Sequence, residues 1–302
     1  MQSPFLLENE SAYQTWRSRK LENYPVRAEQ LIVEVNDPRN LTQAEYEAIL
    51  GSCRKTNMAI YAGRTGADPD KDIPRLLGKR LGLERLDCNM LADDDGLTSL
   101  KVVANAPRQG YIPYSNKPIK WHTDGYYNAP VRQIWALQLH CVQSSAEGGE
   151  NALMDHEIAY LLMRDENPDF IRALMQPDAM TIPARVEEDG VARPDSVGPV
   201  FSVHPESGDL HMRYTARTRS IAWKQDAATL AAVAFLEKLL DSDLTYIYRA
   251  RLEPGMGLVG NNVLHDRAGF NDDETHHRLL YRARYYDRIR GTAVNDVYPG
   301  LS

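Results

Sequence analysis

The chain has 302 residues, of which 43% are hydrophobic and 25% charged, and these proportions are typical of an ordinary globular protein. Its net charge of -7 and its pI near 5.7 argue against a general binder of nucleic acids or anionic membranes. The sequence has no apolar run of about 18 residues and no N-terminal signal peptide. We therefore expect a cytoplasmic protein that does not span a membrane.

The cysteines support the same location. There are three, Cys53, Cys88 and Cys141, which is an odd number without CxxC spacing. A disulfide framework is not expected from this pattern, and a reducing compartment is the default.

Residues 1–95 are expected to form an α/β scaffold, because no chemistry-bearing motif stands out in them. Thr42 and Glu45 form a capping box, and apolar residues follow at helical spacing, which predicts an amphipathic helix. The other elements expected in this part are a helix within 10–30, strands at 31–35 and 58–62, and a helix over 73–81.

From residue 97 onward the pattern predicts many short strands with a few inserted helices. Asp155 and Asp226 are candidate helix caps, and 187–199 is expected to be an exposed loop or lid. Strands are expected at 97–105, 132–142, 151–154, 180–186, 200–203, 210–214, 244–252, 258–264 and 279–287. No internal repeat or linker interrupts the chain. We expect one domain over 1–302, mainly β with flanking helices, whose barrel or sandwich core spans 96–290.

The chemistry is expected around His122 and Asp124. In an extended segment, side chains at i and i+2 project from one face, so these two could hold one metal ion. His265 is the best candidate for a third ligand. Two histidines and one carboxylate form the facial triad of non-haem iron(II) oxygenases. An isolated His-x-Asp pair is more often a hydrogen-bonded turn, which is the alternative interpretation.

An arginine row follows His265. Arg278, Arg282 and Arg284 would share one face of a predicted strand. A buried guanidinium needs compensation, and a bound carboxylate matches its fork of donors. The alternative is a solvated edge, or ion pairs with acidic residues.

These residues together resemble the taurine dioxygenase-like family. The resemblance rests on the His122-x-Asp124 motif with its flanking Trp121 and Gly125, the distant His265, and the arginine pair spaced i, i+4 after it. The turns at 148–149 and 253–255 match as well, and the resemblance covers roughly residues 95–287. It implies a double-stranded β-helix, or jelly roll, and dependence on iron(II) and 2-oxoglutarate.

The resemblance also implies a role for each matching residue. His122, Asp124 and His265 would bind iron, and Arg278 would bind the distal carboxylate of 2-oxoglutarate. Arg282 would lie near the other end of the cosubstrate or an anionic substrate. Asn151 stands where the family has a threonine that helps to hold the distal carboxylate. Its amide could donate in the same way, but the change puts 2-oxoglutarate use in question.

The implied activity is hydroxylation of an unactivated C–H bond with O₂, releasing succinate and CO₂. The substrate would be a small anionic or amino-acid-like metabolite. Surface or ion-paired arginines and ordinary core tyrosines are the alternative for the substrate candidates, which are Tyr114, Asn116, Tyr126, Arg213 and Arg217. The remaining histidines are not expected to be ligands.

Other functions remain open at this point. They are an iron oxygenase or oxidase that does not use 2-oxoglutarate, a non-catalytic metal-binding or ligand-binding jelly roll and, last, a zinc hydrolase. A homo-oligomer is also left open.

Overall fold

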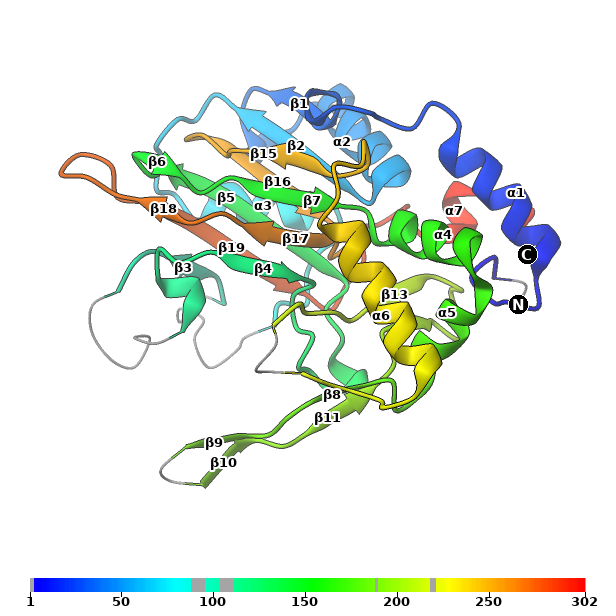
Figure 1. The fold of residues 1–302 in the computed structure, drawn as a ribbon. Helices are drawn as coiled ribbons and strands as arrows, with labels where there is room; N and C mark the ends of the chain where they lie inside the picture. Colours follow the sequence, from blue (N-terminus) through cyan, green and yellow to red (C-terminus); the bar gives the residue numbers. More distant parts are fainter. Residues whose placement is uncertain (1–2, 88–95, 104–110, 188–189, 218–220, 302) are drawn as a thin grey trace.

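The computed structural model describes residues 3–87, 96–103, 111–187, 190–217 and 221–301 (Figure 1). Cys88 therefore lies outside the described residues, as does part of the strand expected at 97–105. The helices are α1 (Glu10–Leu21), α2 (Gln43–Thr56), α3 (Asp72–Arg80), α4 (His156–Glu166), α5 (Pro168–Leu174), α6 (Ala227–Leu240) and α7 (Val294–Val297), with 3₁₀ turns η1 (Ala28–Leu31), η2 (Pro38–Asn40), η3 (Ile112–Tyr114) and η4 (Pro130–Arg132).

The larger sheet has six strands in the order β1-β2-β16-β5-β19-β3. Only the β1–β2 pair is parallel, and the other pairs are antiparallel. The strands are β1 (Ile32–Val35), β2 (Met58–Gly63), β16 (Met256–Gly260), β5 (Ala136–Gln143), β19 (Leu279–Tyr285) and β3 (Thr98–Leu100). The N-terminal strands β1 and β2 thus extend a sheet whose other strands come from residue 98 onward.

A second, antiparallel sheet has four strands in the order β15-β7-β17-β4. Its strands are β15 (Tyr248–Ala250), β7 (Asn151–Met154), β17 (Leu264–Arg267) and β4 (Ile119–His122). The smaller pairings involve β6 (Glu147–Gly148) with β18 (Phe270–Asn271), β12 (Phe201–Val203) with β13 (Leu210–Met212), β9 (Arg185–Glu187) with β10 (Gly190–Arg193), and β8 (Met180–Ile182) between β11 (Ser196–Gly198) and β14 (Ala222–Trp223).

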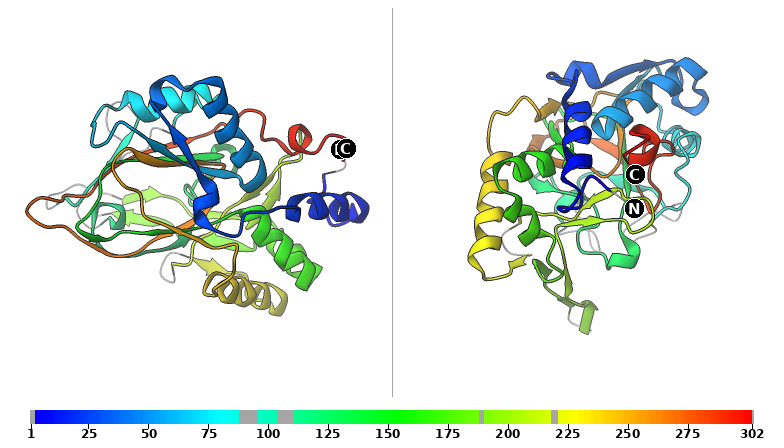
Figure 2. Two further views of the ribbon diagram at one scale, coloured as in Figure 1. Left: turned by 90° about the horizontal axis from the view of Figure 1, so that it is seen from above. Right: turned by 90° about the vertical axis from the view of Figure 1, so that its right-hand side faces the viewer.

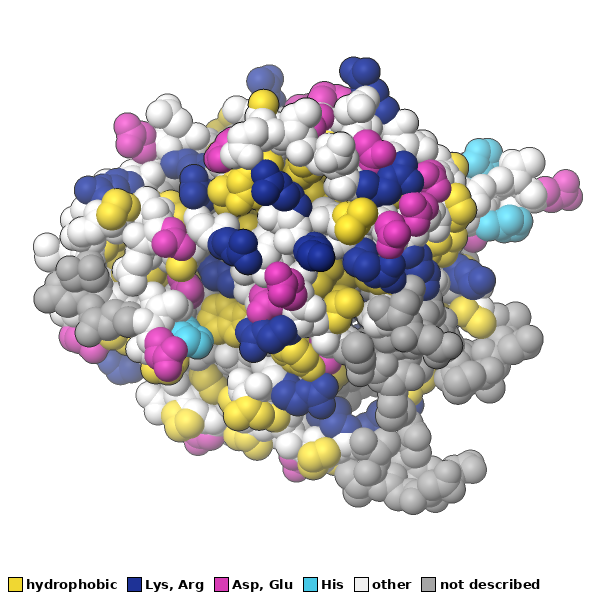
Figure 3. All heavy atoms as spheres, turned by 180° about the vertical axis from the view of Figure 1, so that it is seen from behind, with side chains coloured by type: hydrophobic (Ala, Val, Ile, Leu, Met, Phe, Trp, Pro, Cys, Tyr) yellow, Lys and Arg dark blue, Asp and Glu magenta, His cyan; other side chains and the backbone are white. Residues whose placement is uncertain are grey.

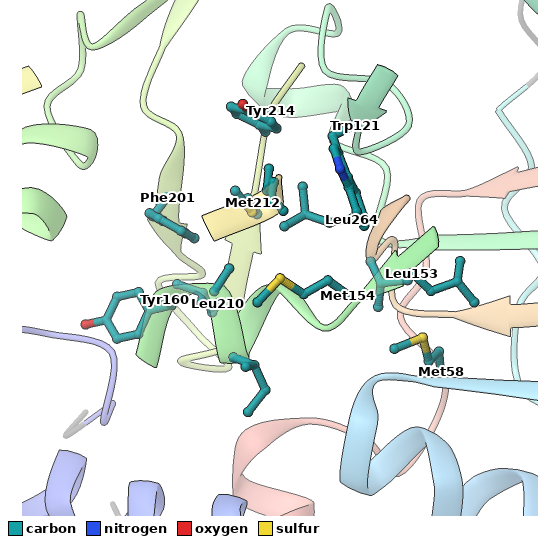
Figure 4. Close-up of a cluster of buried hydrophobic side chains, with 14 of the residues drawn as sticks. Met58, Trp121, Leu153, Met154, Tyr160, Phe201, Leu210, Met212, Tyr214 and Leu264 are labelled. Carbon is teal, nitrogen blue, oxygen red and sulfur yellow. The ribbon is translucent and has the colours of Figure 1, made fainter. Parts of the chain in front are cut away.

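Two apolar clusters hold these layers together. One lies between the larger sheet and helices α2 and α3, which cover one face of that sheet (Figure 2). The other joins the two sheets with α1, α4, α5 and α6. Trp121 and Leu264 belong to it and lie near each other in Figure 4. Because strand side chains alternate, the residues that follow them, His122 and His265, point to the opposite face of the smaller sheet from Trp121 and Leu264.

Helix α2 shows how closely local sequence determined local structure. Thr42 accepts from the backbone N–H of Glu45, whose side chain returns to the Thr42 N–H, so the predicted capping box is present. Asp155 and Asp226 cap α4 and α6 as expected. The helix predicted over 73–81 and most strands also form, with bounds shifted by a few residues.

One strand prediction was wrong. The single strand expected over 258–264 is divided into β16 and β17, which belong to different sheets. Asn261 and Asn262 separate them, and Asn262 has a φ of 51°. Asparagine tolerates this left-handed region better than most residues do, so the chain can leave one sheet and enter the other within two residues.

The expected loop or lid at 187–199 is also corrected. Its described residues contain β10 and β11, and β9 and β10 form an antiparallel hairpin that projects from the body of the protein (Figure 1). Most of the described residues of this segment therefore lie in paired strands, and β11 pairs with β8.

A buried ionic cluster ties α1 to the start of α4. The ammonium group of Lys20 is fully buried and lies 2.7 Å from carboxylate oxygens of both Asp155 and Glu157. Burial alone would lower the pKa of Lys20, but the two carboxylates raise it well above its usual value. Asn57 donates to the same Asp155 at 2.9 Å.

In the described part of the chain, no helix is both long and apolar enough to cross a bilayer. On the face seen from behind, acidic and basic side chains are interspersed with apolar ones (Figure 3). The free cysteines Cys53 and Cys141 are both buried.

Candidate active site

His122 and His265 face each other across two neighbouring strands. They are direct register partners in the antiparallel β4–β17 pair, and their ring centroids are 4.2 Å apart. Residues opposite each other in antiparallel strands have their Cβ atoms about 5 Å apart, so both imidazoles can reach one small ion. Their approach is therefore set by the sheet.

Asp124 lies beside the two histidines, but a turn positions it rather than the extended strand that was predicted. Strand β4 ends at His122, so the alternation of an extended strand does not place Asp124. Its backbone N–H instead donates to Oδ1 of Asn262 at 2.8 Å, and Asn262 Nδ2 donates to the Asp124 carbonyl oxygen at 2.9 Å. The turn continues through Gly125, which has a φ of 69°.

The three side chains form one cluster of potential ligand atoms, which lie within 4.8 Å of one another. Nδ1 of His122 is 2.9 Å from the Lys120 carbonyl oxygen, and Nδ1 of His265 is 2.9 Å from that of Val263. Because a carbonyl only accepts, both Nδ1 atoms carry the proton and both Nε2 atoms keep a free lone pair.

One oxygen of the Asp124 carboxylate is also available to bind a metal ion. Its Oδ2 is buried and has no hydrogen-bond partner among the described residues. Leaving such an atom unsatisfied is costly, and a cation bound by Oδ2 and the two Nε2 atoms would satisfy it. The donor set therefore fits a divalent metal of the iron or zinc type.

The protonation states of the cluster suit metal binding. Burial, and then the neighbouring His265, lower the pKa of His122 to about 3, so the imidazole is neutral at physiological pH. Burial alone would raise the pKa of Asp124, but the guanidinium groups of Arg282 and Arg284 hold it below its usual value.

Two of the three arginines in the predicted row, Arg282 and Arg284, form ion pairs with acidic residues, as in the alternative interpretation. Arg282 and Arg284 point to the cluster from β19: Nη1 of Arg282 lies 3.3 Å from Asp124 Oδ1, and Nη1 of Arg284 lies 4.0 Å from it. Arg284 also pairs with the buried Asp87 and donates to the Tyr127 hydroxyl at 2.7 Å. Acidic residues of the protein therefore compensate both of these arginines.

Arg278 is different, since no described carboxylate lies within ion-pair distance of it. It is buried and lines a pocket together with Asn151, Gly149 and Leu280. Its guanidinium lies 5.1 Å from the ring centroid of Phe270, and that of Arg267 lies 5.0 Å from the same centroid. Burial lowers the pKa of Arg278 to about 10 and that of Arg267 to about 9. Both remain cationic at neutral pH, and a bound anion would offset the cost of burying them.

Asn151 lies in the same pocket, but its amide is already engaged. Nδ2 donates to the Asp266 carbonyl oxygen at 2.5 Å, while the Asp266 carboxylate accepts from the Ala152 N–H at 2.6 Å. The side chain thus ties β7 to β17 beside His265, and only its second N–H could serve a ligand.

The substrate candidates are dispersed. Tyr126 is buried, with its ring centroid 6.5 Å from that of His122, and its hydroxyl accepts from Arg217 at 3.3 Å. Arg213 is buried and donates to the carbonyls of Met180 and Ser196. Away from the cluster, Tyr114 is a core residue and Asn116 is exposed, with its carbonyl accepting from Phe270. Tyr126 thus contacts the predicted ligand His122 directly, and Arg217 is connected to it through the Tyr126 hydroxyl.

The sequence did not predict four residues of the site. Asn262, Asp87, Arg267 and Phe270 contact predicted site residues without belonging to a recognised motif. Arg267 and Phe270 closely follow His265 in the sequence, and this closeness to a predicted ligand was a weak indication that they belong to the site. Asp87 offered none, because its contact with Arg284 spans 197 positions.

The fold and the candidate ligands define a class of protein: two imidazoles and one carboxylate presented by a sheet are the metal site of non-haem iron(II) oxygenases. Comparison with known proteins gives the family. Residues 19–284 match the family described as "Taurine catabolism dioxygenase TauD, TfdA family". The chain belongs to this family, whose members are iron(II)- and 2-oxoglutarate-dependent dioxygenases, and the family predicted from the sequence is confirmed.

Individual relatives agree with this result. Over 178 residues the chain is 31% identical to uridine-5'-phosphate dioxygenase from Amycolatopsis sp, an alignment that covers 57% of this chain and 62% of that protein, just under two thirds of its length. A putative alpha-ketoglutarate-dependent taurine dioxygenase from Burkholderia xenovorans has a similar fold, with a TM-score of 0.55, 17% identity and coverage of 86% of this chain and 88% of that one. The non-heme iron oxygenase OrfP, solved with iron, succinate and a hydroxylated arginine, has a TM-score of 0.58 at 15% identity and covers 81% of each chain.

Proposed function

We propose that the protein is an iron(II)- and 2-oxoglutarate-dependent oxygenase that hydroxylates an unactivated C–H bond of a small anionic metabolite. The observation that carries this proposal is the convergence of His122, Asp124 and His265, whose potential ligand atoms lie within 4.8 Å of one another.

In this proposal His122 and His265 hold the metal through Nε2, and Asp124 holds it through Oδ2. The Lys120 and Val263 carbonyls keep both imidazoles in the required tautomer. Arg282 occupies Oδ1 of Asp124, which leaves Oδ2 free. Iron(II) together with 2-oxoglutarate supplies the oxygen-activating chemistry, with succinate and CO₂ as coproducts.

The pocket lined by Arg278 is the proposed site of the distal carboxylate of 2-oxoglutarate. The Arg278 guanidinium is buried and lacks a described acidic partner, and its fork of donors matches a carboxylate bidentately. Phe270 packs against it and keeps water from one side. Arg267 adds a second positive charge near the same ring.

For the substrate, we propose an anionic small molecule bound on the side of Tyr126 and Arg217. The relative from Amycolatopsis is named for a nucleoside monophosphate, which supports an anionic substrate for this chain as well. Tyr126 lies beside His122, where a substrate must lie if its C–H bond is to react.

The proposal extends to architecture and location. The two main sheets, with one apolar cluster between them, support a jelly-roll core within a single domain over 1–302. Cys53 and Cys141 are buried and form no disulfide with each other, which is in keeping with a reducing compartment. We therefore place the reaction in the cytoplasm. The reaction would consume O₂ together with the small-molecule substrate.

A second candidate function is an oxygenase that uses the same metal ligands without 2-oxoglutarate. It is favoured by one observation, the commitment of the Asn151 amide to the Asp266 carbonyl. Release of one succinate for each product molecule would exclude it.

Anaerobic titration tests the main proposal. Iron(II) is added to the protein, then 2-oxoglutarate, and the weak visible charge-transfer band of the chelate is followed. A saturable band is expected for the wild-type protein. Iron binding without a band would favour the second candidate, and no iron binding would contradict both.

A further inference from the structure

A pair of tyrosines stands directly beside the candidate metal ligands. Tyr126 and Tyr127 follow Gly125, and their rings meet edge to face with centroids 5.2 Å apart. The Tyr126 ring also meets that of His122 edge to face at 6.5 Å. The tyrosine pair therefore borders the candidate ligands on the side of His122.

Arg217 is brought to this pair by backbone pairing. Thr215 forms an isolated antiparallel bridge with His122, and the Ala216 N–H donates to the Trp121 carbonyl at 2.8 Å. The Arg217 side chain then donates from Nη1 to the Tyr126 hydroxyl at 3.3 Å. The position of this guanidinium is therefore tied to the strand that carries His122.

Arg193 approaches the same pair from the end of β10. Its guanidinium lies 5.9 Å from the Tyr127 ring centroid and donates to the carbonyls of Pro183 and Pro194. Arg213 has a buried Nε without a hydrogen-bond partner among the described residues. Burial, and then the charge of Arg193, lower the pKa of Arg213 to about 10. Arg193 and Arg217, from separate parts of the chain, thus each bring a positive charge to one of the two neighbouring tyrosines.

This charge is not balanced within the protein. Among the residues whose side chains the structure describes, no carboxylate lies within ion-pair distance of Arg193, Arg213 or Arg217. By contrast, Arg282 and Arg284 are paired with Asp124 and Asp87. The chain has more acidic than basic residues, so a lack of acids does not explain the difference. Partly buried guanidinium groups without anions are costly, and a bound anion would offset that cost.

The geometry points to an anion-binding subsite at the tyrosine pair, formed by Arg217 at Tyr126 and Arg193 at Tyr127, which takes a phosphate monoester group of the prime substrate. This inference rests on the proposed function and names its substrate class. A carboxylate is matched by one guanidinium fork, whereas two guanidinium groups and a hydroxyl on different segments suit a dianion with three oxygens that accept in several directions. The subsite shares no lining residue with the Arg278 pocket, so cosubstrate and substrate anions are held apart.

The test uses the full chain loaded with Mn(II) and 2-oxoglutarate, and follows the ³¹P relaxation of two probes, uridine-5'-phosphate and inorganic phosphate. Paramagnetic relaxation falls steeply with distance, so only phosphate held near the metal is affected. At least one probe should show saturable relaxation. Arg217→Gln and Arg193→Gln should each weaken its binding at least tenfold, because each removes a charge-assisted hydrogen bond.

Arg80→Gln is the matched control. Arg80 lies over the ring of Tyr46 at 4.4 Å, in a similar cation–aromatic contact far along the chain from the predicted ligands, and its loss should leave phosphate binding unchanged. Circular dichroism and thermal unfolding establish that each variant is folded, and Arg217→Lys provides a milder replacement that keeps the charge.

Two outcomes overturn the subsite. Relaxation that persists in both glutamine variants means that phosphate binds the metal directly or elsewhere. Absence of relaxation with either probe, in protein that still forms the iron(II)–2-oxoglutarate band, rejects a phosphate group while leaving the proposed function intact. Failure of the band itself rejects the proposed function instead.

Discussion

The side-chain amide of Asn262 holds the backbone of Asp124 at both its N–H and its carbonyl group, with bonds of 2.8 and 2.9 Å. The same Nδ2 atom also donates to the Ile134 carbonyl at 2.8 Å. Asn262 precedes His265 by three residues, so one buried side chain connects the segments that carry two of the proposed metal ligands.

Replacing Asn262 with glycine should weaken iron(II) binding about 10- to 100-fold, a typical cost of removing support from a metal ligand. Glycine adopts a φ of 51° freely, so the variant loses the hydrogen bonds without backbone strain. Anaerobic iron titration measures the effect. Asn57→Gly is the matched control, since Asn57 is also buried with a φ of 59° but bonds Asp155. It should lose stability and keep its iron affinity; equal affinities in the two variants would contradict this role of Asn262.

His122→Ala and Asp124→Ala should each abolish stoichiometric iron binding, because two ligands that remain cannot form a facial triad. Iron content after anaerobic reconstitution and desalting gives the answer. His204→Ala provides the comparison, since His204 lies beside Trp135 and outside the ligand cluster. Near-normal iron content in both ligand variants would remove the metal site from this place.

Arg278→Gln should raise the concentration of 2-oxoglutarate needed for half-maximal band formation by about 10- to 150-fold. This corresponds to the loss of about 1.5–3 kcal/mol for hydrogen bonds to a charged group. Iron affinity should not change. Arg251 lines the same pocket but is ion-paired with Glu253, so Arg251→Gln should have a much smaller effect. An unchanged requirement in Arg278→Gln would place the distal carboxylate elsewhere.

Gly148→Ala should disturb the Arg278 pocket. Gly148 has a φ of 72°, and an added Cβ would overlap the carbonyl of Gly269, the residue just before β18 and Phe270. Gly66 has a φ of 58° with open space around it. Gly66→Ala should therefore cost only about 1 kcal/mol of conformational strain, whereas Gly148→Ala should cost more and also weaken 2-oxoglutarate binding. Urea unfolding and band titration separate the two effects, and identical behaviour would contradict the steric argument.

Stability should decrease as the pH falls below about 6.5. Burial lowers the pKa of His140 to about 4 and, with His156 nearby, that of His211 to about 3. The unfolded chain therefore binds protons that the native protein does not, and each histidine removes about 1.4 kcal/mol of unfolding free energy per pH unit below the unfolded pKa. Urea unfolding at pH 7, 6 and 5 measures this slope. His140→Asn and His211→Gln should each lower the number of protons taken up on unfolding by about one, and so reduce the slope. An unchanged slope in both variants would exclude these residues as its source.

Short-range features were largely predictable from the sequence. The capping box at Thr42 and Glu45, the caps Asp155 and Asp226, and the family itself followed from local patterns. His122 and His265 could be chosen because their neighbours fit a strand, although the sheet pairing that opposes them was not visible.

The rest depended on contacts between distant positions. The division of one predicted strand at Asn262 reflects a change of sheet, which a run of apolar residues does not reveal. The pairing of Arg284 with Asp87 depends on residues 197 positions apart. Sequence patterns therefore could not distinguish Arg284 from Arg278, which has no acidic partner in the described part of the chain.

The distance along the chain between the two halves of the candidate metal site also has a consequence for biosynthesis. Asp124 and Asn262 are 138 positions apart, and β4 cannot pair with β17 until the latter has left the ribosome. A nascent chain that ends before His265 has no such site, and closing so long a loop is slow compared with local structure formation. Iron binding at the proposed ligands therefore requires that β4 and β17 have paired, and iron uptake by a newly made chain would report this pairing.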